Sequence, residues 1–375
     1  MKDENPALKS SKPGLGPNPT RDQITMSSST VTDTQSWYFR DSEGKGFLAA
    51  VVTAAMDVLA FLEYPDRSSK KSKRTYGDRW KFGMLVLKEF LDLSDRDLVR
   101  ILPSLRGVME AGRVERVPHH TTLRKYSKRV PVGLVDKVIG ETARILRGND
   151  SVIAVDATGF SESNASKHFV KRLKAFGTET QTVRDFAKAT LAVDVQSKAI
   201  AVCDVATSHT ADVKRFVPVS EKLKDTGIPV SVLLADKGYD AEYIHLEARR
   251  IFGFGISTQI PARNCKSPKA ERQEWRNAPK GYHRRMMDRS LDLSVYRFRS
   301  IVETVNSMLK RKMGETVYGK TMESVSKEIR FTALAHNLRL ILEGGSDQVL
   351  MISSKPRPRA RDYSKEKCER GGLRP

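Results

Sequence analysis

Residues 296–310 have the sequence YRFRSIVETVNSMLK, whose pattern predicts an α-helix with two distinct faces. At about 100° per residue, one face is apolar over an arc of roughly 140°. Its members are Val295, Phe298, Ile301, Val302, Val305, Met308 and Leu309. The opposite face gathers Tyr296, Arg299, Glu303 and Lys310 within roughly 60°. We expect the apolar face to dock on a core, leaving one carboxylate between two cations and a phenol.

Two interpretations of this polar face are open. In the first, the face is solvated, and Arg299 and Glu303 form an ordinary ion pair four residues apart. In the second, Glu303 belongs to a site to which distant parts of the chain contribute further carboxylates. The choice depends on whether other acidic residues are placed to meet Glu303.

The overall charge of the chain points to a polyanionic partner. The 375 residues are enough for two or three domains, and 39% of them are hydrophobic, which provides for real cores. The 66 Lys and Arg residues exceed the 45 Asp and Glu residues, so the formal net charge is +21. Binding an extended polyanion would relieve this self-repulsion, so nucleic acid is the first partner to consider. The alternative is a protein with a merely basic surface.

Cysteine content and hydropathy bear on the compartment. The three cysteines, Cys203, Cys265 and Cys368, are far apart and form no CxxC or Cys/His cluster, so we expect neither a disulfide framework nor a zinc site. The opening residues are polar and rich in Pro and Gly, unlike a signal peptide. The most apolar run, residues 47–62, contains Asp57 and is too short to span a bilayer. We expect a cytoplasmic, nucleoid-associated protein with no membrane partner.

Changes of composition predict four segments. Residues 1–44 mix Ser, Thr, Pro, Gly and charge without apolar periodicity, which is typical of a disordered leader. Residues 45–148 have helical periodicity and are expected to form a helical DNA-binding domain. In residues 149–343, short apolar runs alternate with helical patterns, which indicates an α/β domain. Residues 344–375 are expected to form a basic disordered tail.

The helical domain contains a helix-turn-helix-like pattern. Ser94 is placed to cap a helix over residues 95–102, which Pro103 would end. After a loop, a second helix begins near His119, with Thr121 as its expected cap. This second helix would approach DNA with its cations meeting phosphates, and the alternative is a solvated basic helix. The cations are Arg124, Lys125, Lys128 and Arg129. Further helices are expected over residues 47–62 and 80–91.

The α/β domain is predicted to be ribonuclease-H-like, with a mixed five-stranded sheet and helices. Strands are expected over residues 151–159, 189–195, 199–207, 229–240 and 254–262, and helices over residues 209–225, 241–252 and 327–342. The first three strands would pair antiparallel, while the later ones join through helices. In that architecture the first and fourth strands lie side by side.

Two aspartates follow expected strands. The apolar run of the first strand is predicted to end in Asp156 and a turn at Gly159, and that of the fourth in Asp236 and a Gly, where open α/β sheets expose a site. Glu303 would arrive on a helix packed against the same sheet. Three meeting carboxylates repel one another unless a cation neutralises them, and oxygen ligands favour Mg²⁺ or Mn²⁺.

Two such ions, about 3.5–4 Å apart, are a recurrent device of phosphodiester chemistry. We therefore expect the three carboxylates to hold a pair of ions. Arg299 and Lys310 would offset charge on the phosphate, and Tyr296 would hydrogen-bond to the nucleic acid or stack on it.

Over roughly residues 80–342, the chain resembles insertion-sequence transposases with a DDE catalytic domain. The signature on their last catalytic helix is Tyr, two residues, Arg, three residues, Glu, six residues and Lys, which residues 296, 299, 303 and 310 reproduce. The contexts VIAVDATGF around Asp156 and LLADKGYD around Asp236 also resemble the Asp blocks of the family. The intervals between the three acids suit members without a large inserted β-domain.

The resemblance implies cleavage at transposon ends and joining of the freed 3′-hydroxyl to target DNA. It also implies end-specific DNA binding by a homodimer or a larger synaptic complex. One alternative is a ribonuclease-H-like nuclease or junction resolvase, which needs the same carboxylates without end specificity. Another is a non-catalytic DNA-binding protein derived from a transposase, against which the complete set of carboxylates and flanking cations argues.

Several further polar residues have competing interpretations. Lys188 precedes the second strand and is a candidate for DNA contact or a plain surface lysine. Lys237 and Tyr239 are candidates for lining a DNA groove. Asp194 and Asp204 lie inside or beside strands and could in principle join the site. Asp194 is nevertheless expected on a solvated face, because it alternates with apolar neighbours, and Asp212 is expected to cap a helix.

Overall fold

The computed structural model describes residues 46–67, 75–147, 151–162, 186–207, 209–263 and 280–344. The predicted leader, residues 1–44, lies outside these ranges, as does all of the predicted tail except Gly344. Within the described ranges, no helix combines the length and the apolar character needed to cross a membrane.

The N-terminal part is helical, as its periodicity predicts. Its elements are α1 (Phe47–Phe61), α2 (Asp78–Phe90), α3 (Asp95–Ile101), η3 (Leu102–Ser104), α4 (Arg106–Ala111), α5 (His120–Arg129) and α6 (Val132–Leu146). The predicted cap of α3 is confirmed, because the backbone N–H of Asp97 donates to Ser94 Oγ at 3.1 Å. The predicted cap of α5 is wrong: His119 is the N-cap, and its Nδ1 accepts from the N–H of Thr121.

Helix α4 and the 3-10 turn η3 separate α3 from α5, although these two helices contact each other. The connection between them is therefore longer than the simple turn that a helix-turn-helix pattern suggests. Helix α5 buries Leu123 and Tyr126, so its remaining side chains are free to face outward.

The central sheet is mixed, as predicted. Its strands are β1 (Ser151–Glu162), β2 (Phe186–Asp194), β3 (Ile200–Thr207), β4 (Val230–Ala235), β5 (Ser257–Gln259) and β6 (Thr316–Val317). The order is β3-β2-β1-β4-β5, with β2 antiparallel to both β1 and β3. Strand β4 runs parallel to β1, and β5 runs parallel to β4. This mixed sheet with its helices fits a ribonuclease-H-like domain.

Two details of the predicted sheet are wrong. Asp156 does not end the first strand: β1 continues to Glu162, and Asp156 pairs with Leu191 in mid-strand. Gly159 is not a turn residue but a place of close approach, because a Cβ there would lie 3.0 Å from the Phe186 ring. The longer strand leaves room for a sixth strand, β6, which pairs with the far end of β1.

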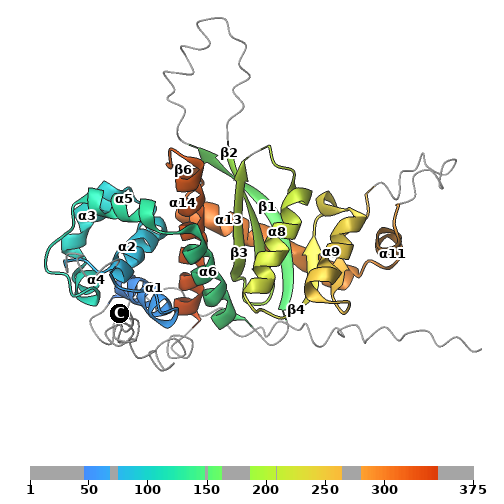
Figure 1. The fold of residues 1–375 in the computed structure, drawn as a ribbon, viewed down its shortest axis with the longest axis horizontal. Helices are drawn as coiled ribbons and strands as arrows, with labels where there is room; N and C mark the ends of the chain where they lie inside the picture. Colours follow the sequence, from blue (N-terminus) through green and yellow to red (C-terminus); the bar gives the residue numbers. More distant parts are fainter. Residues whose placement is uncertain are drawn as a thin grey trace, which may run out of the picture. The chain divides into compact units, whose positions relative to one another are not determined.

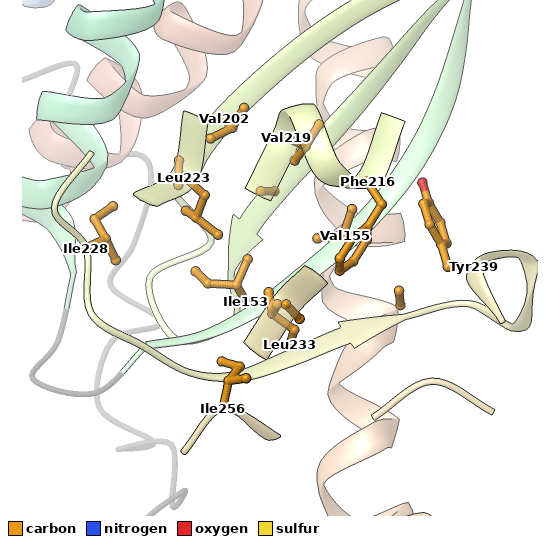
Figure 2. Close-up of a cluster of buried hydrophobic side chains, with 14 of the residues drawn as sticks. Ile153, Val155, Val202, Phe216, Val219, Leu223, Ile228, Leu233, Tyr239 and Ile256 are labelled. Atoms are coloured by element: carbon orange, nitrogen blue, oxygen red, sulfur yellow. The ribbon is translucent and has the colours of Figure 1, made fainter. Parts of the chain in front are cut away.

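Helices cover both faces of this sheet (Figure 1). The remaining helical elements are α8 (Asp212–Asp225), η4 (Lys237–Tyr239), α9 (Glu242–Phe252), α11 (Tyr282–Ser290), α12 (Leu293–Tyr296), η6 (Arg297–Arg299), α13 (Ser300–Met313) and α14 (Met322–Glu343). One face buries Ile153 and Val155 of β1 against α8 and α9 (Figure 2). Because side chains alternate along a strand, Asp156 faces the opposite side, where α13 contacts β1 and β2.

Helix α14 joins the N-terminal helices to the sheet. It contacts α1, α2 and α6 as well as β3, and Figure 1 shows it between the two groups. The Phe331 ring packs edge-on against Phe82 of α2, with their centroids 5.0 Å apart. Most of α14 is buried. The helix begins at Met322, so the start expected at residue 327 is wrong. The boundary predicted at residues 148 and 149 stays a prediction.

A buried amide fixes α14 to the edge strand β3. Asn337 is fully buried, and its Oδ1 accepts from the backbone N–H of Ile200 at 2.8 Å. Its Nδ2 donates to the carbonyl of Ile200 at 2.8 Å and to Thr142 Oγ1 of α6 at 3.0 Å. One side chain thereby satisfies both backbone groups of an edge residue and links three elements.

Replacing Asn337 with Ala should lower the free energy of unfolding by about 2–4 kcal/mol, because two buried backbone groups lose their partners. Urea unfolding followed by circular dichroism measures this loss. The control is Arg339→Ala on the same helix, where only an ion pair with Glu343 is removed and a change within about 0.5 kcal/mol is expected. Equal effects of the two substitutions would contradict the role assigned to Asn337.

Candidate active site

Strand pairing brings the two predicted aspartates together. In the parallel ladder of β1 and β4, Val155 is paired with Ala235, so Asp156 and Asp236 are the next residues of neighbouring strands. Asp236 directly follows β4, as predicted, and stands at the N-cap of η4. The pairing register alone therefore places both carboxylates at one point of the sheet.

Helix α13 brings the third carboxylate. The stretch over residues 296–310 is helical but not one regular α-helix, because the 3-10 turn η6 separates α12 from α13. Val302, Val305 and Leu309 are buried, as their spacing predicts. Asn306, one turn after Glu303, donates from Nδ2 to Asp156 Oδ2 at 3.2 Å. This contact attaches the helix to β1 beside the first aspartate.

The three carboxylates influence one another electrostatically. The pKa of Asp156 is raised to about 6, mainly because burial disfavours its charge. The backbone N–H of Ala157 and the Arg299 guanidinium lower this pKa, whereas the charges of Glu303 and Asp236 raise it. Asp156, Asp236 and Glu303 therefore share one electrostatic environment.

Arg299 is a cation that contacts this group. Its Nη2 lies 2.6 Å from Glu303 Oε1, so the ordinary ion pair expected between residues 299 and 303 is present. Burial alone would lower the pKa of Arg299, but the hydrogen bond to Glu303 and the neighbouring charges, including Asp236, raise it. The ion pair of the first interpretation is therefore present, and membership of Glu303 in a shared carboxylate site stays a prediction.

Tyr296 and Lys310 complete the polar face. The Arg299 Cζ lies 6.0 Å from the centre of the Tyr296 ring, and burial raises the pKa of the Tyr296 hydroxyl. Lys310 Nζ lies 6.0 Å from the ring of Phe160, a buried residue four positions after Asp156 on β1. The ring holds the ammonium on the same face of the strand as Asp156.

The loop that carries Asp236 is held by two arginines. Arg263 donates from Nε to the Lys237 carbonyl at 2.7 Å and from Nη2 to the Gly238 carbonyl at 3.0 Å. Arg284 of α11 grips the buried Asp240 carboxylate with two hydrogen bonds of 2.7 and 2.6 Å. Asp236 consequently sits on a firmly attached turn, and this support was not evident from the sequence.

Two residues expected to contact DNA have other surroundings. Tyr239 is buried, and its ring lies 6.1 Å from that of Phe216 at the margin of the core cluster (Figure 2). Its side chain therefore lines the core rather than a DNA groove. The Lys188 ammonium binds Asp212 at 2.8 Å and the Thr210 carbonyl at 3.0 Å, so it has partners within the protein. Lys237 is exposed, and its contact with DNA stays a prediction.

The other aspartates serve the fold. Asp194 is buried, not solvated as expected, and accepts hydrogen bonds from Ser197 in the turn between β2 and β3. The expectation was wrong because helices cover both faces of this sheet, so alternation does not indicate solvent. Asp212 holds Lys188 instead of capping α8, whose N-cap is Ala211.

Asp204 is also buried, and it belongs to an ion-pair network away from α13. Its carboxylate binds Arg215 and, at 2.9 Å, Lys222 of α8. Lys222 also reaches Asp136 of α6, which pairs with Arg330 of α14 at 2.6 Å. These partners account for the charge of Asp204 and remove it from the candidate site.

The carboxylates of Asp156, Asp236 and Glu303 are ligands that suit a hard divalent ion, but these side chains are not gathered around one position. In the described part of the chain, no three His, Cys, Asp or Glu residues are grouped closely enough to hold a metal. The expected three-carboxylate site is therefore not confirmed, and the pairing of Glu303 with Arg299 is one reason. Oxygen donors, mutual repulsion and the unpartnered, buried Asn306 Oδ1 nevertheless suit a cation or its waters.

The basic face expected on α5 is present. Arg124, Lys125, Lys128 and Arg129 are all exposed, while Leu123 and Tyr126 point into the core. The C-terminal carbonyls of α5 are bound by Lys327 of α14, whose Nζ lies 3.0 Å from the Lys128 oxygen. Contact of this face with DNA stays a prediction.

Asn306 is the residue of the site that the sequence pattern missed. It lies between Val305 and the buried turn ending at Leu309, on the side of α13 assigned to the core. An uncharged amide at a core position, one turn after a candidate ligand, is the signal that could have identified it, because buried polar groups need partners.

A model of the family described as "Transposase DDE domain" matches residues 147–338, slightly more than half of the chain. Searches among curated proteins and among solved structures gave no significant match. The matched range includes the three carboxylates and the other residues of the polar face.

The raised pKa of Asp156 predicts that ionisation of this carboxyl lowers the free energy of unfolding. Since the folded-state pKa of about 6 exceeds the ordinary value of 3.8, the contribution of Asp156 to stability falls as pH rises from about 4 to 6. Asp156→Asn should therefore be more stable than wild type at pH 8, by about 1–2 kcal/mol after solvent screening is allowed for, and equally stable at pH 4.

Thermal unfolding in a chelator at pH 4 to 8 checks this, since the chelator keeps divalent cations from masking the effect. The matched control is Asp225→Asn at an exposed position of α8, which should change stability little at any pH. A difference between wild type and Asp156→Asn that does not vary with pH would contradict the assigned cause.

Proposed function

Since this chain belongs to the family of transposases with a DDE domain, we propose that it cuts DNA at the ends of a mobile element. It then joins the freed 3′-hydroxyl to target DNA. Membership of the family implies a DNA substrate. The observation that carries the proposal is geometric: the register of β1 and β4 sets Asp156 and Asp236 side by side, and α13, which bears Glu303, contacts Asp156 through Asn306.

The proposed cofactor is Mg²⁺ or Mn²⁺, in one or two ions, with Asp156, Asp236 and Glu303 as the residues that would hold them. When bound, such ions lower the pKa of an attacking water or hydroxyl and stabilise the leaving oxygen. Glu303 would have to exchange its contact with Arg299 for this role. Its side chain is half exposed, so such a rotation meets little packing resistance.

Arg299 and Lys310 have the proposed role of offsetting charge on the reacting phosphate. Release of Arg299 from Glu303 by a phosphate would free the carboxylate and place the guanidinium on the DNA backbone at the same time. The Phe160 ring restricts Lys310 to the side of β1 that bears Asp156. Tyr296, beside Arg299, is suited to hydrogen-bond to the DNA or stack on it.

The exposed cations of α5 are proposed to bind the transposon ends by contacting phosphates. Cutting two ends of one element and joining both to a target requires two sites, so a homodimer or larger synaptic complex is part of the proposal.

Replacing any one of the three carboxylates with Ala should reduce cleavage at transposon ends by at least about 10³-fold while leaving end binding intact. A supercoiled plasmid that carries the DNA flanking the reading frame is the substrate, and gel shifts measure binding. The control is Asp225→Ala, an exposed carboxylate away from the site, which should cleave normally. Unchanged cleavage by Asp156→Ala, Asp236→Ala or Glu303→Ala would remove that residue from the site. Nicking without dependence on the end sequence would favour a nuclease instead.

The basic face of α5 generates a separate prediction about salt dependence. Changing Arg124, Lys125, Lys128 and Arg129 to Gln should weaken DNA binding and reduce the slope of log affinity against log salt by about 0.9 per lost phosphate contact. Fluorescence anisotropy of a labelled duplex over a salt series measures the slope. The control is Lys214→Gln with Lys224→Gln on α8, where both cations are exposed. The same slope change per charge in both variants would contradict a specific role for α5.

A further inference from the structure

Asn306 of α13 is a polar residue in an apolar setting. Val302, Val305 and Leu309, its neighbours on the inner side of the helix, are fully buried, and Asn306 itself is only 8% exposed. Such a position ordinarily takes an apolar residue, because an amide that is not fully hydrogen-bonded destabilises a core. A reason for the amide therefore has to be sought in what it contacts.

One half of the amide binds Asp156. The Nδ2 donates to Asp156 Oδ2 at 3.2 Å. This orientation is required by chemistry, because an ionised carboxylate only accepts hydrogen bonds and so must face the nitrogen. Since Asn306 and Glu303 are one turn apart on α13, the same contact relates the position of Glu303 to that of Asp156.

The other half of the amide has no partner. Asn306 Oδ1 is buried and accepts no hydrogen bond in the described residues. Unsatisfied polar atoms are rare in protein interiors, and one in the same amide that binds Asp156 indicates that this place receives a polar ligand.

We propose that Asn306 is a positioning residue of this site: its amide nitrogen fixes the Asp156 carboxylate, and its free oxygen accepts a hydrogen bond from water or a hydroxyl there. This inference rests on the proposed function, since it assigns Asp156 to divalent-cation binding. Asn306 acts through Asp156 and orients it, as the partners of metal ligands commonly do. Through the same helix it also fixes the turn of α13 that bears Glu303 relative to Asp156.

The test is Mn²⁺ binding by the purified full chain, measured from the electron paramagnetic resonance signal of free Mn²⁺, and it needs no DNA. The Mn²⁺-binding sites that matter are those that are lost when Asp156 is replaced in Asp156→Ala. Asn306→Leu keeps the approximate size and removes both polar atoms, so it should weaken Mn²⁺ binding about 10–100-fold. Its melting temperature in a chelator should be equal to that of wild type or higher, because a buried unpaired oxygen is lost. Ser307→Ala, at the exposed next position, is the control and should bind Mn²⁺ normally.

A double substitution separates positioning from direct contact with the ion. If Asn306 acts through Asp156, then Asn306→Leu should add no further loss of affinity in the Asp156→Asn background. An additive loss would overturn the positioning role.

The other possible outcomes also test the role proposed for Asn306. Wild-type affinity in Asn306→Leu would overturn this inference and leave the proposed function standing. Asn306→Ala is the second variant should Leu prove too bulky, and unfolding of both variants would show a structural role and overturn the inference. Absence of any Asp156-dependent Mn²⁺ binding in wild type would overturn the metal-dependent part of the proposed function, and this inference with it.

Discussion

Packing of α13 across one face of β1 is the constraint on which the rest of the candidate site depends. Asp156 lies on that face because side chains alternate along the strand, while Ile153 and Val155 enter the core on the other face. The parallel pairing of β1 with β4 then supplies Asp236 beside it. Only a helix that crosses at this point can add Glu303, and the contact from Asn306 marks the crossing.

Bringing like charges together has a cost, part of which Arg299 offsets. Arg299 pairs with Glu303 and also lowers the pKa of Asp156, so one cation serves more than one carboxylate. The remaining cost appears in the raised pKa of Asp156, whose charge is disfavoured by burial and by its neighbours. The side chains of the site offset only part of this cost. A bound cation would offset more of it, so the site is suited to binding one.

The rigidity that this arrangement needs comes from outside the site. Asn337 and the network of Asp204, Asp136 and Arg330 fasten α14 and α6 to β3. Arg284 secures the turn after Asp236 by way of Asp240. Buried ion pairs contribute little net stability but are costly to break, so they keep each element in one position. The carboxylates can therefore repel one another without displacing the backbone that carries them.

Local patterns were sufficient for much of the architecture. Apolar runs located the strands, and the Ser94 cap was evident because capping involves residues three positions apart. The extension of β1 past Gly159 was not evident, since a glycine marks either a turn or a close approach, and the Phe186 ring on the partner strand decides between them. Likewise Asp194 and Tyr239 gave no sign of burial, which depends on the helices packed over them.

The sequence by itself determined which residues are the candidates for the chemistry, because the order Tyr, Arg, Glu and Lys and the two Asp blocks are properties of the chain alone. Only the tertiary structure decided how those residues interact. The internal contacts of Lys188 and Tyr239 and the contact of Asn306 with Asp156 each depend on elements distant in sequence. The pairing of Arg299 with Glu303, by contrast, joins residues four positions apart and was open to prediction from their spacing. The physical reason is that burial and charge neighbourhood arise from packing across the sheet, which no interval along the chain encodes.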